Sequence, residues 1–236
     1  MKRIILKISG EALSGTDYKG INADKVQEIA SEIKALYETG VSLGIIVGAG
    51  NIWRGRDAEK NHMEQAKADY MGMLGTILNA LALENALNNI SVPTKVMSMI
   101  AVPAVVDTYT RREALEHLEK RTVIIFAGGT GSPFFTTDTT AALKAAEVNA
   151  ELILMAKNGV DGVYSSDPRT DKDAMRFSKM SYDQIIEGEL KVMDLTAATI
   201  CNENNISMVV FDMNVEGNIK RAYENPEIGT IIESKK

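Results

Sequence analysis

Short apolar runs and amphipathic stretches alternate along the whole of this 236-residue sequence. The apolar runs are rich in Val, Ile, Leu and Met and are continuous, as in strands that are buried on both faces of a sheet. We expect strands at residues 3–8, 41–47, 94–99, 122–127, 151–156, 207–210 and 230–232. Regular alternation of strands with helices is typical of a parallel sheet. The sequence therefore predicts an α/β fold with a mostly parallel central sheet and helices on both faces.

The amphipathic stretches carry helix signals at their ends. Asn22 is a candidate N-cap for a first helix, and Gly40 follows that helix as a left-handed cap residue. Capping boxes that begin at Thr110 and Ser181 predict two further helix starts. The helix expected at about residues 65–87 has more apolar positions than one buried stripe requires, which favours burial against a partner subunit. Other helices are expected at 139–150, at 194–204 and from 214, and residues 157–179 should be irregular.

Composition and charge narrow the class of protein. The chain is 45% hydrophobic and 25% charged, which is ordinary for a globular protein. Its formal net charge of −6 and pI near 5.1 argue against a broad nucleic-acid-binding surface. A single cysteine, Cys201, and the lack of a signal peptide or a long apolar span favour a reducing cytoplasm and no membrane. Because no linker, charge block or repeat divides the sequence, we expect one compact domain, or two lobes that share one continuous sheet.

A turn at residues 128–140 has the composition of an anion-binding pocket. It reads GGTGSPFFTTDTT and lies between an apolar run and a predicted helix. A glycine-rich turn that enters a helix leaves backbone N–H groups free at the positive end of the helix dipole. The segment favours a site for a phosphorylated small molecule, with an ordinary connecting loop as the alternative.

Two further glycine-containing turns follow predicted strands. The first is Lys7-Ile8-Ser9-Gly10-Glu11, and the second spans residues 48–55, GAGNIWRG. Neither is a common nucleotide-binding loop, because no Gly-Lys-Ser or Gly-Lys-Thr occurs and the third glycine of the dinucleotide fingerprint is missing. Parallel strands place their carboxyl ends at one edge of the sheet, where ligands bind. Three such turns therefore predict that two anionic ligands can share that edge.

These motifs occur in an order that resembles a known family. The matching segments are residues 7–11, 48–55, 69–73 (DYMGM), 129–147 (GTGSPFFTTDTTAALKAAE) and 157–164, followed by Asp167 and Pro168. Together they resemble the amino acid kinase superfamily and, within it, the bacterial UMP kinases. The resemblance implies a three-layer sandwich of the carbamate kinase type. It also implies an acceptor-binding lobe at about residues 1–150 and an ATP-binding lobe at about residues 151–236, with one sheet shared by both.

The activity that the resemblance implies is direct in-line transfer of a phosphoryl group from ATP to UMP, which gives ADP and UDP for pyrimidine nucleotide biosynthesis. The second pKa of a phosphate monoester is about 6, so the acceptor is largely a dianion at neutral pH and needs no general base. Catalysis then consists of aligning two anionic groups and neutralising the transferring phosphoryl group. No set of Cys, His or carboxylate residues has the spacing of a dedicated metal cage, so we expect Mg²⁺ to be held mainly by the phosphates of ATP.

The same resemblance assigns roles to individual residues. Catalytic roles fall to Lys7, Arg54, Lys157 and Asp138, with Asp138 holding the lysines in place rather than acting as a base. The expected ATP-binding residues are Lys7, Ile8, Ser9, Gly10, Gly50, Arg54, Asn158, Tyr164 and Asp167. The expected UMP-binding residues are Ala49, Asp69, Thr130, Gly131, Ser132, Pro133, Phe134, Phe135, Thr136 and Thr137. Whether the two phenylalanines contact the base or fill the core stays open.

Regulation and assembly are also implied by the resemblance. The polar loop formed by Gly15, Thr16, Asp17, Tyr18, Lys19 and Gly20 corresponds to a segment near an effector site for GTP. GTP is the implied activator, UTP the implied inhibitor and a homohexamer the implied assembly. Two other functions stay open at this point. One is a kinase of the same superfamily that phosphorylates a carboxylate or carbamate, and the other is a nucleotide sensor without catalysis.

Overall fold

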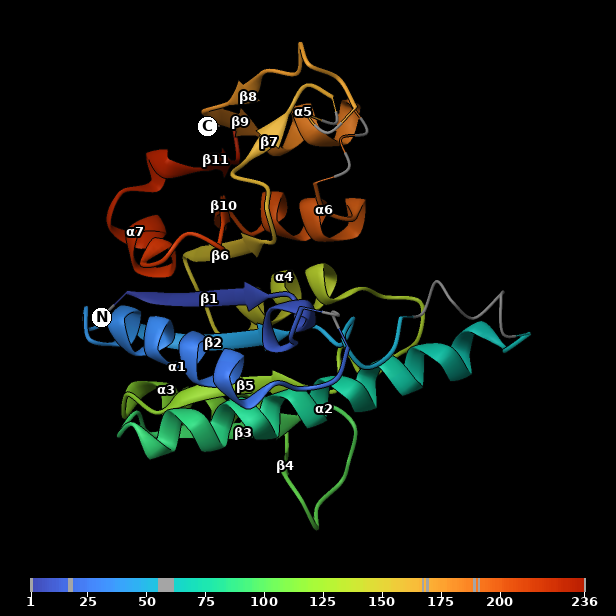
Figure 1. The fold of residues 1–236 in the computed structure, drawn as a ribbon, viewed down its shortest axis with the longest axis vertical. Coiled ribbons are helices and arrows are strands. Elements are labelled where there is room, and N and C mark those ends of the chain that lie inside the picture. The colour runs from blue at the N-terminus through green and yellow to red at the C-terminus, as the bar shows by residue number, and fades with distance from the viewer. Residues whose placement is uncertain are drawn as a thin grey trace.

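A nine-stranded sheet forms the middle layer of the structure (Figure 1). The structure is a computed structural model that describes residues 2–16, 19–54, 62–166, 168, 170–188, 190 and 192–235. Within the described part of this sheet the strand order is β4-β3-β5-β2-β1-β6-β10-β11-β9, and β10–β11 is its only antiparallel pair. The strands are β1 (Arg3–Ile8), β2 (Ser42–Val47), β3 (Thr94–Ser98), β4 (Asp107–Thr108), β5 (Val123–Ala127), β6 (Leu152–Lys157), β9 (Lys179–Ser181), β10 (Ser207–Asp212) and β11 (Thr230–Glu233). The expected mostly parallel sheet is confirmed.

Successive side chains of the strands point to two hydrophobic cores, one on each face of the sheet. In β1, for example, Ile4, Leu6 and Ile8 belong to the first core, whereas Ile5 belongs to the second. The helices of the first core are α1 (Ala23–Tyr37), α2 (Gln65–Asn89) and α7 (Asn218–Glu224). The helices of the second core are α3 (Arg111–Glu119), α4 (Thr137–Glu147), α5 (Tyr182–Glu187) and α6 (Leu195–Glu203). The period-two alternation of the strands thus produces the expected three layers, with helices on both faces.

Side-chain caps begin the helices where the sequence predicts them. The Asn22 side chain accepts a hydrogen bond from the Lys25 N–H at 3.0 Å, and Ser181 forms a complete capping box with Gln184. The box at Thr110 is only half formed, because the Thr110 hydroxyl donates to the Glu113 carboxylate at 2.9 Å instead of leaving that carboxylate to the backbone. Gly40, with φ of +90°, turns the chain after α1. These caps satisfy N–H groups that the first turn of a helix leaves unpaired.

Three local expectations are corrected by the structure. The helix expected from Asn214 begins at Asn218, because the Asp212 side chain accepts from the Asn214 N–H at 2.9 Å and holds a turn there. The helix expected from residue 139 begins at Thr137, because the Thr136 hydroxyl accepts from the backbone of the first turn. The stretch at 157–179 contains a short hairpin of β7 (Val163–Tyr164) and β8 (Arg176–Phe177). Two 3₁₀ turns, η1 (Gly10–Leu13) and η4 (Pro226–Ile228), were not expected.

The strand connections change direction between β1 and β6. From β1 the chain passes through η1 and α1 to β2 on one side, whereas from β6 it continues to β10 on the other side. Ligands of open α/β sheets bind outside the carboxyl ends of the strands at such a point, because the two connections diverge and leave a crevice. Lys7 is aligned with Met155 of β6 close to that end. The topology therefore places the first predicted motif at the crevice.

No helix in the described part of the chain has both the length and the apolar character that crossing a membrane requires.

Glycine at position 229 is required by a close backbone approach. A Cβ atom added there would lie 2.1 Å from the carbonyl oxygen of Val210, which belongs to β10 and cannot move away as a flexible side chain can. We expect Gly229→Ala to lower the free energy of unfolding by about 3 kcal/mol, at the upper end of the cost of overpacking. Urea denaturation measures this change.

The matched control is Gly72→Ala in α2, where the nearest atom outside the helix backbone is 4.0 Å away. This change should raise the free energy of unfolding by about 0.5–1 kcal/mol, because alanine is the better helix former. Equal stability of the two variants would contradict the close approach of Gly229 to the Val210 carbonyl oxygen.

Candidate active site

Lys7, Asp138 and Lys157 meet at the carboxyl ends of β1 and β6. The Nζ atom of Lys7 lies 2.6 Å from Oδ1 of Asp138, and Nζ of Lys157 lies 3.9 Å from Oδ2 of the same carboxylate. The side chains are 11%, 15% and 26% exposed in the order Lys7, Asp138, Lys157, so all three are mostly buried yet reach the surface. Three elements supply them: β1, the first turn of α4 and the end of β6. We call these residues the lysine–aspartate cluster.

The cluster has one positive charge in excess. Burial raises the pKa of the Asp138 carboxyl, but the charges of Lys7 and Lys157 lower it by more, so the net pKa is below the ordinary value. Burial lowers the pKa of Lys157, and the Asp138 carboxylate opposes this shift. Nζ of Lys157 also donates to the carbonyl oxygen of Val192 at 2.7 Å. Two cations that share one carboxylate leave a part-buried site that favours an anion.

The turns after β1 and β2 pack against each other beside the cluster. The Gly48 N–H donates to the carbonyl oxygen of Ile8 at 3.0 Å. A Cβ atom at Gly10 would lie 2.4 Å from the carbonyl oxygen of Gly48, so only glycine fits at position 10. Arg54 donates through Nε to the Gly50 carbonyl oxygen at 3.1 Å and forms an ion pair with Glu11. The two turns therefore form one unit that carries a guanidinium group.

The turn after β5 is held by α2. The Gly128 N–H donates to the Thr76 hydroxyl at 2.8 Å, and the Phe134 N–H donates to the Asp69 carboxylate at 2.8 Å. Phe134 has φ of +71°, an unfavourable conformation for a side chain of this kind, which the contact with Asp69 helps to hold. The turn ends at Thr136, whose hydroxyl caps α4 by accepting from the N–H groups of Asp138 and Thr139.

A cavity of about 310 Å³ separates this turn from α2. It is lined by Ala49, Trp53, Gln65, Ala68, Asp69, Gly72, Met73, Thr76, Gly129, Ser132, Phe135, Thr136, Thr137 and Thr140. Its size is at the lower end of the range for small-molecule sites, and its walls combine apolar side chains with hydroxyls and a carboxylate. The cavity is adjacent to the cluster because α4 supplies Asp138 directly after Thr136 and Thr137.

The structure brings together six of the ten residues expected to bind UMP, all of which line this cavity: Ala49, Asp69, Ser132, Phe135, Thr136 and Thr137. The other four, Thr130, Gly131, Pro133 and Phe134, belong to the same turn but are not part of the lining. Phe134 is 74% exposed and Phe135 51% exposed, so neither fills the hydrophobic core. Their roles toward a ligand remain predictions.

The residues expected to bind ATP are divided between two places. Lys7, Ser9, Gly10, Gly50 and Arg54 lie at the paired turns. The Ile8 side chain is fully buried, so only its backbone can face a ligand.

The remaining ATP-binding predictions concern residues farther along the chain. Asn158 accepts from Asn214 at 2.6 Å, and it lines a cavity of about 750 Å³ that Gly15 and Thr16 also line. Tyr164 lies in the hairpin and donates to Asp161 at 2.7 Å. Asp167, as well as Asp17 and Tyr18 of the expected effector loop, lies outside the described residues. Lys19 and Gly20 of that loop are exposed.

Asp194 is a site residue that the sequence did not indicate. Its Oδ1 atom accepts from the Thr139 hydroxyl and from the Ala197 N–H, both at 2.8 Å, and Oδ2 accepts from the Thr136 hydroxyl. One carboxylate thus joins the first turns of α4 and α6 beside Asp138. The sequence marks Asp194 as the start of a helix, but it does not indicate which threonines the side chain contacts. Glu11, the partner of Arg54, was missed for the same reason.

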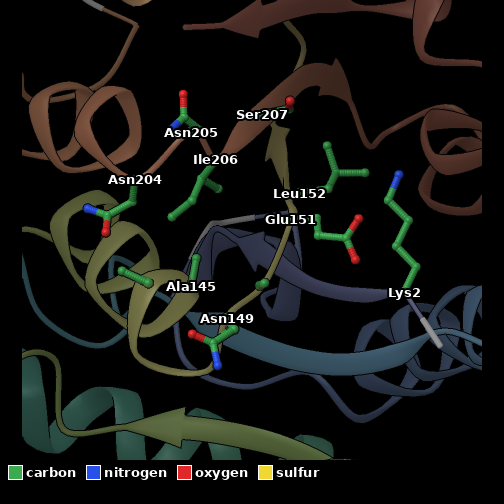
Figure 2. Close-up of a pocket in the computed structure, with 11 residues that line it drawn as sticks. Lys2, Ala145, Asn149, Glu151, Leu152, Asn204, Asn205, Ile206 and Ser207 are labelled. Carbon is green, nitrogen blue, oxygen red and sulfur yellow. The ribbon is translucent and has the colours of Figure 1, made fainter.

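A third cavity lies at the opposite edge of the sheet (Figure 2). It has a volume of about 500 Å³, and its lining includes Lys2, Asn149, Glu151, Asn204 and Ser207. Here α4 and α6 end, and their terminal carbonyl groups already accept hydrogen bonds from Asn149 and Asn205. Ligands of parallel sheets bind at the carboxyl ends of the strands rather than at this edge. The lysine–aspartate cluster is therefore the stronger candidate site.

In the described part of the chain, no three or more His, Cys, Asp or Glu side chains form a group that could hold a metal ion.

Removing the Asp138 charge should change how stability depends on pH. The lowered pKa means that the ionised carboxylate stabilises the fold above about pH 4, the pKa of an unfolded aspartate, and that this contribution is lost as the pH falls through the lower folded-state pKa. We expect Asp138→Asn to be less stable than the parent at pH 7, with a difference that shrinks below about pH 4.

Urea denaturation from pH 7 to pH 3 measures this difference. Asp24→Asn, at the exposed start of α1, is the matched control for loss of one carboxylate. A difference between parent and Asp138→Asn that grows toward low pH would contradict the charge arrangement described above.

Comparison with known proteins identifies relatives over the full length of the chain. The family model described as the amino acid kinase family matches residues 2–212. A uridylate kinase from Pediococcus pentosaceus is 51% identical over 231 residues, which are 98% of this chain and 96% of the relative. A uridylate kinase from Limosilactobacillus reuteri is 52% identical over 232 residues, 98% of this chain and 97% of the relative.

Solved structures of UMP kinases are also similar to this chain over nearly its whole length. A UMP kinase from Bacillus anthracis has a TM-score of 0.96 at 36% identity, over 100% of this chain and 97% of that chain. A UMP kinase from Ureaplasma parvum has a TM-score of 0.94 at 41% identity, over 99% of both chains. Because the family model matches residues 2–212 and two uridylate kinases are 51% and 52% identical over 98% of this chain, the chain belongs to the amino acid kinase family.

Proposed function

We propose that this chain transfers the γ-phosphoryl group of ATP to UMP, giving ADP and UDP in pyrimidine nucleotide biosynthesis. The observation that carries the proposal is the lysine–aspartate cluster, with its excess positive charge, between the paired glycine turns and the cavity beside α2. The uridylate and UMP kinases that match over nearly the full chain support UMP as the acceptor.

The acceptor explains why the site contains cations but needs no strong base. The UMP phosphate has a second pKa of about 6 and is largely a dianion at neutral pH, so its oxygen can attack without losing a proton. Asp138 suits no such role, because a carboxyl group with a lowered pKa is a weak base. We assign to Asp138 the task of holding Lys7 and Lys157 at the place where charge must be neutralised.

Catalysis then follows from position and charge. Lys7 and Lys157 would contact oxygens of the transferring phosphoryl group, and their positions are set in advance by the shared carboxylate. Arg54 presents a planar guanidinium that suits phosphate oxygens and is oriented by Glu11. Preorganised cations of this kind lower the barrier because no reorganisation is needed when the charge moves.

The UMP is assigned to the cavity of about 310 Å³ beside α2. Thr136 and Thr137 would contact its phosphate at the start of α4, next to Asp138. Asp69 would accept hydrogen bonds from ribose hydroxyls, which gives a means of rejecting a deoxynucleotide. In the structure Asp69 accepts from the Phe134 N–H, so the turn and the ribose would be bound by one carboxylate.

Mg²⁺ would be held by oxygens of the ATP phosphates and by water. Mg²⁺ prefers oxygen ligands, and the Asp138 carboxylate is already paired with two lysines. The phosphates of ATP and water therefore remain as the ligands that fit the ion. When bound, the ion supplies further positive charge for the phosphates.

The outer face of α2 supports a homo-oligomer, and we propose the homohexamer that the family resemblance implies. Tyr70, Met71, Leu74 and Leu78 recur along one side of the helix and are 39–52% exposed. An apolar stripe of this length is typical of a surface that another subunit covers.

Control by GTP and UTP stays a proposal from the same resemblance, as does a cytoplasmic location, which the single buried Cys201 thiol supports. Among the described residues, the cavity beside Gly15 and Thr16 is lined by Glu11, Glu28, Glu32 and Glu216 but by only one lysine, Lys25, so this lining offers a triphosphate little charge complementarity. We therefore do not place GTP in that cavity.

An acceptor panel tests the proposed function. UMP, CMP, dTMP, glutamate, aspartate and carbamate are each offered with ATP and Mg²⁺, and ADP is followed by a coupled assay. We expect turnover with UMP far above that with the other acceptors. Turnover with a carboxylate or carbamate instead would assign a different member of the family, and no turnover with any acceptor would favour a sensor.

Lys7 gives the sharpest test of the catalytic assignment. We expect Lys7→Met to lower kcat by about 10² to 10³, the typical effect of removing one preorganised charge, without unfolding the protein. Lys220→Met is the control, since Lys220 lies on α7 and forms an exposed ion pair with Glu224. Near-normal turnover in Lys7→Met would show that the residue is assigned wrongly.

The α2 surface is tested by gel filtration at micromolar concentration. The parent should elute as an oligomer, and the double variant Leu74→Glu/Leu78→Glu should elute at a lower mass, because two charges in the interface must be desolvated. Val215→Glu is the control, since Val215 is 48% exposed and lies outside α2. A monomeric parent would count against the assembly.

A further inference from the structure

Two buried amides, Asn51 and Asn79, form a reciprocal pair beneath the turn that follows β2. Nδ2 of Asn79 donates to Oδ1 of Asn51 at 2.8 Å, and Nδ2 of Asn51 donates to Oδ1 of Asn79 at 3.0 Å. Each amide has a second N–H, and both are used: Asn79 donates to the Gly48 carbonyl oxygen and Asn51 to that of Gly20, each at 2.7 Å. Because carbonyl oxygens only accept, these outer contacts also determine which end of each amide carries nitrogen.

The pair is fully buried and fully satisfied. Asn79 is 0% exposed and Asn51 is 4% exposed. A buried amide destabilises the fold unless its hydrogen bonds are made. If packing were the only requirement at these two positions, apolar side chains would meet it without that cost. The pair instead joins three separate segments: α2, the turn after β2 and the loop at Gly20, whose N–H donates back to the Asn51 carbonyl oxygen at 2.8 Å.

The pair also determines the direction in which the backbone N–H groups of the turn after β2 point. A trans peptide unit is planar, with its C=O and N–H pointing in opposite directions, so a Gly48 carbonyl directed at Asn79 turns the Ala49 N–H away from α2. Among the described residues, the N–H groups of Ala49, Gly50 and Asn51 have no intramolecular acceptor. Ala49 and Asn51 are nevertheless buried residues. Unpaired N–H groups in such surroundings are ready to receive an anionic oxygen.

The same pair fixes the distance between the turn and β1. A Cβ atom at Gly10 would lie 2.5 Å from Oδ1 of Asn51 and 2.4 Å from the Gly48 carbonyl oxygen. Gly10 therefore packs directly on the Asn51 amide, and it lies only three residues after Lys7 in the chain. A shift of either amide moves the turn relative to the lysine–aspartate cluster.

We infer that Asn51 and Asn79 are positioning residues for phosphoryl transfer, which hold the N–H groups of the Gly48–Asn51 turn in register with Lys7. The inference rests on the proposed function. Neither amide touches the reacting groups, and both act through the turn. Misplacing a contact by about 1 Å can cost on the order of 10² in rate, so loss of the pair should affect kcat more than substrate binding.

Two variants of Asn79 test this role. Asn79→Leu removes both donors at similar volume, whereas Asn79→Asp keeps the shape and the acceptor for Asn51 but cannot donate to the Gly48 carbonyl oxygen. Asn88→Leu and Asn88→Asp are the matched controls, since Asn88 lies on the same helix and also bonds to backbone, at Thr94. The folded fraction is measured by circular dichroism, and kcat and KM are measured for ATP and UMP.

Per folded molecule, both Asn79 variants should lose about 10²-fold in kcat, with each KM within about threefold of the parent and with the Asn88 variants close to the parent. A purely structural role would lower the folded fraction without this split. The inference is overturned if a folded Asn79 variant keeps kcat within threefold of the parent, or if both variants fail to fold. An active parent with active Asn79 variants contradicts only the inference, whereas a parent inactive on UMP contradicts the proposed function as well.

Discussion

The sharing of one carboxylate by two lysines is the interaction on which the rest of the site depends. Lys7 and Lys157 are mostly buried, and without Asp138 two like charges would face each other away from water. The fold meets this requirement with adjacent strands, because β1 and β6 supply the lysines and α4 begins directly beside them. Asp194 then fixes α4 against α6. The Asp138 carboxylate on α4 is therefore held by helix packing as well as by its charge. The positive charges of Lys7 and Lys157 are therefore in position before a phosphate dianion binds.

Helix α2 holds the ligand turns from the other side. Asp69, Thr76 and Asn79 lie on one face of the helix, and each contacts a different part of the turn structure: Phe134, Gly128 and Gly48. The opposite face carries the exposed apolar residues assigned to a partner subunit. One helix therefore connects the proposed assembly surface with the turns around the proposed UMP cavity, which explains why its apolar positions exceed the needs of one core.

The fold was largely predictable from sequence because its strands are continuous apolar runs and its helices carry side-chain caps. One error came where a side chain competes with the helix for a backbone N–H: the Asp212 side chain accepts from the Asn214 N–H, so α7 begins only at Asn218. The lysine–aspartate cluster was identified through the family resemblance, whereas spacing alone placed Lys7 and Lys157 only at strand ends. Asp194, Asn51 and Asn79 were missed because their partners lie 28 to 58 positions away, and no local pattern reports such contacts. Confirmation therefore reaches the family and the fold, while residue roles remain predictions.

A crystal structure with ADP, UMP, Mg²⁺ and aluminium fluoride measures the central arrangement most directly, because the metal fluoride imitates the transferring phosphoryl group. We predict that the fluoride ligands lie within hydrogen-bond distance of Nζ of both Lys7 and Lys157. We also predict that the Asp138 carboxylate contacts only the lysines, with no contact to the UMP phosphate. A metal fluoride bound away from both lysines, or an Asp138 carboxylate in contact with the attacking oxygen of UMP, would contradict the assignment of Asp138 as the residue that holds the cations.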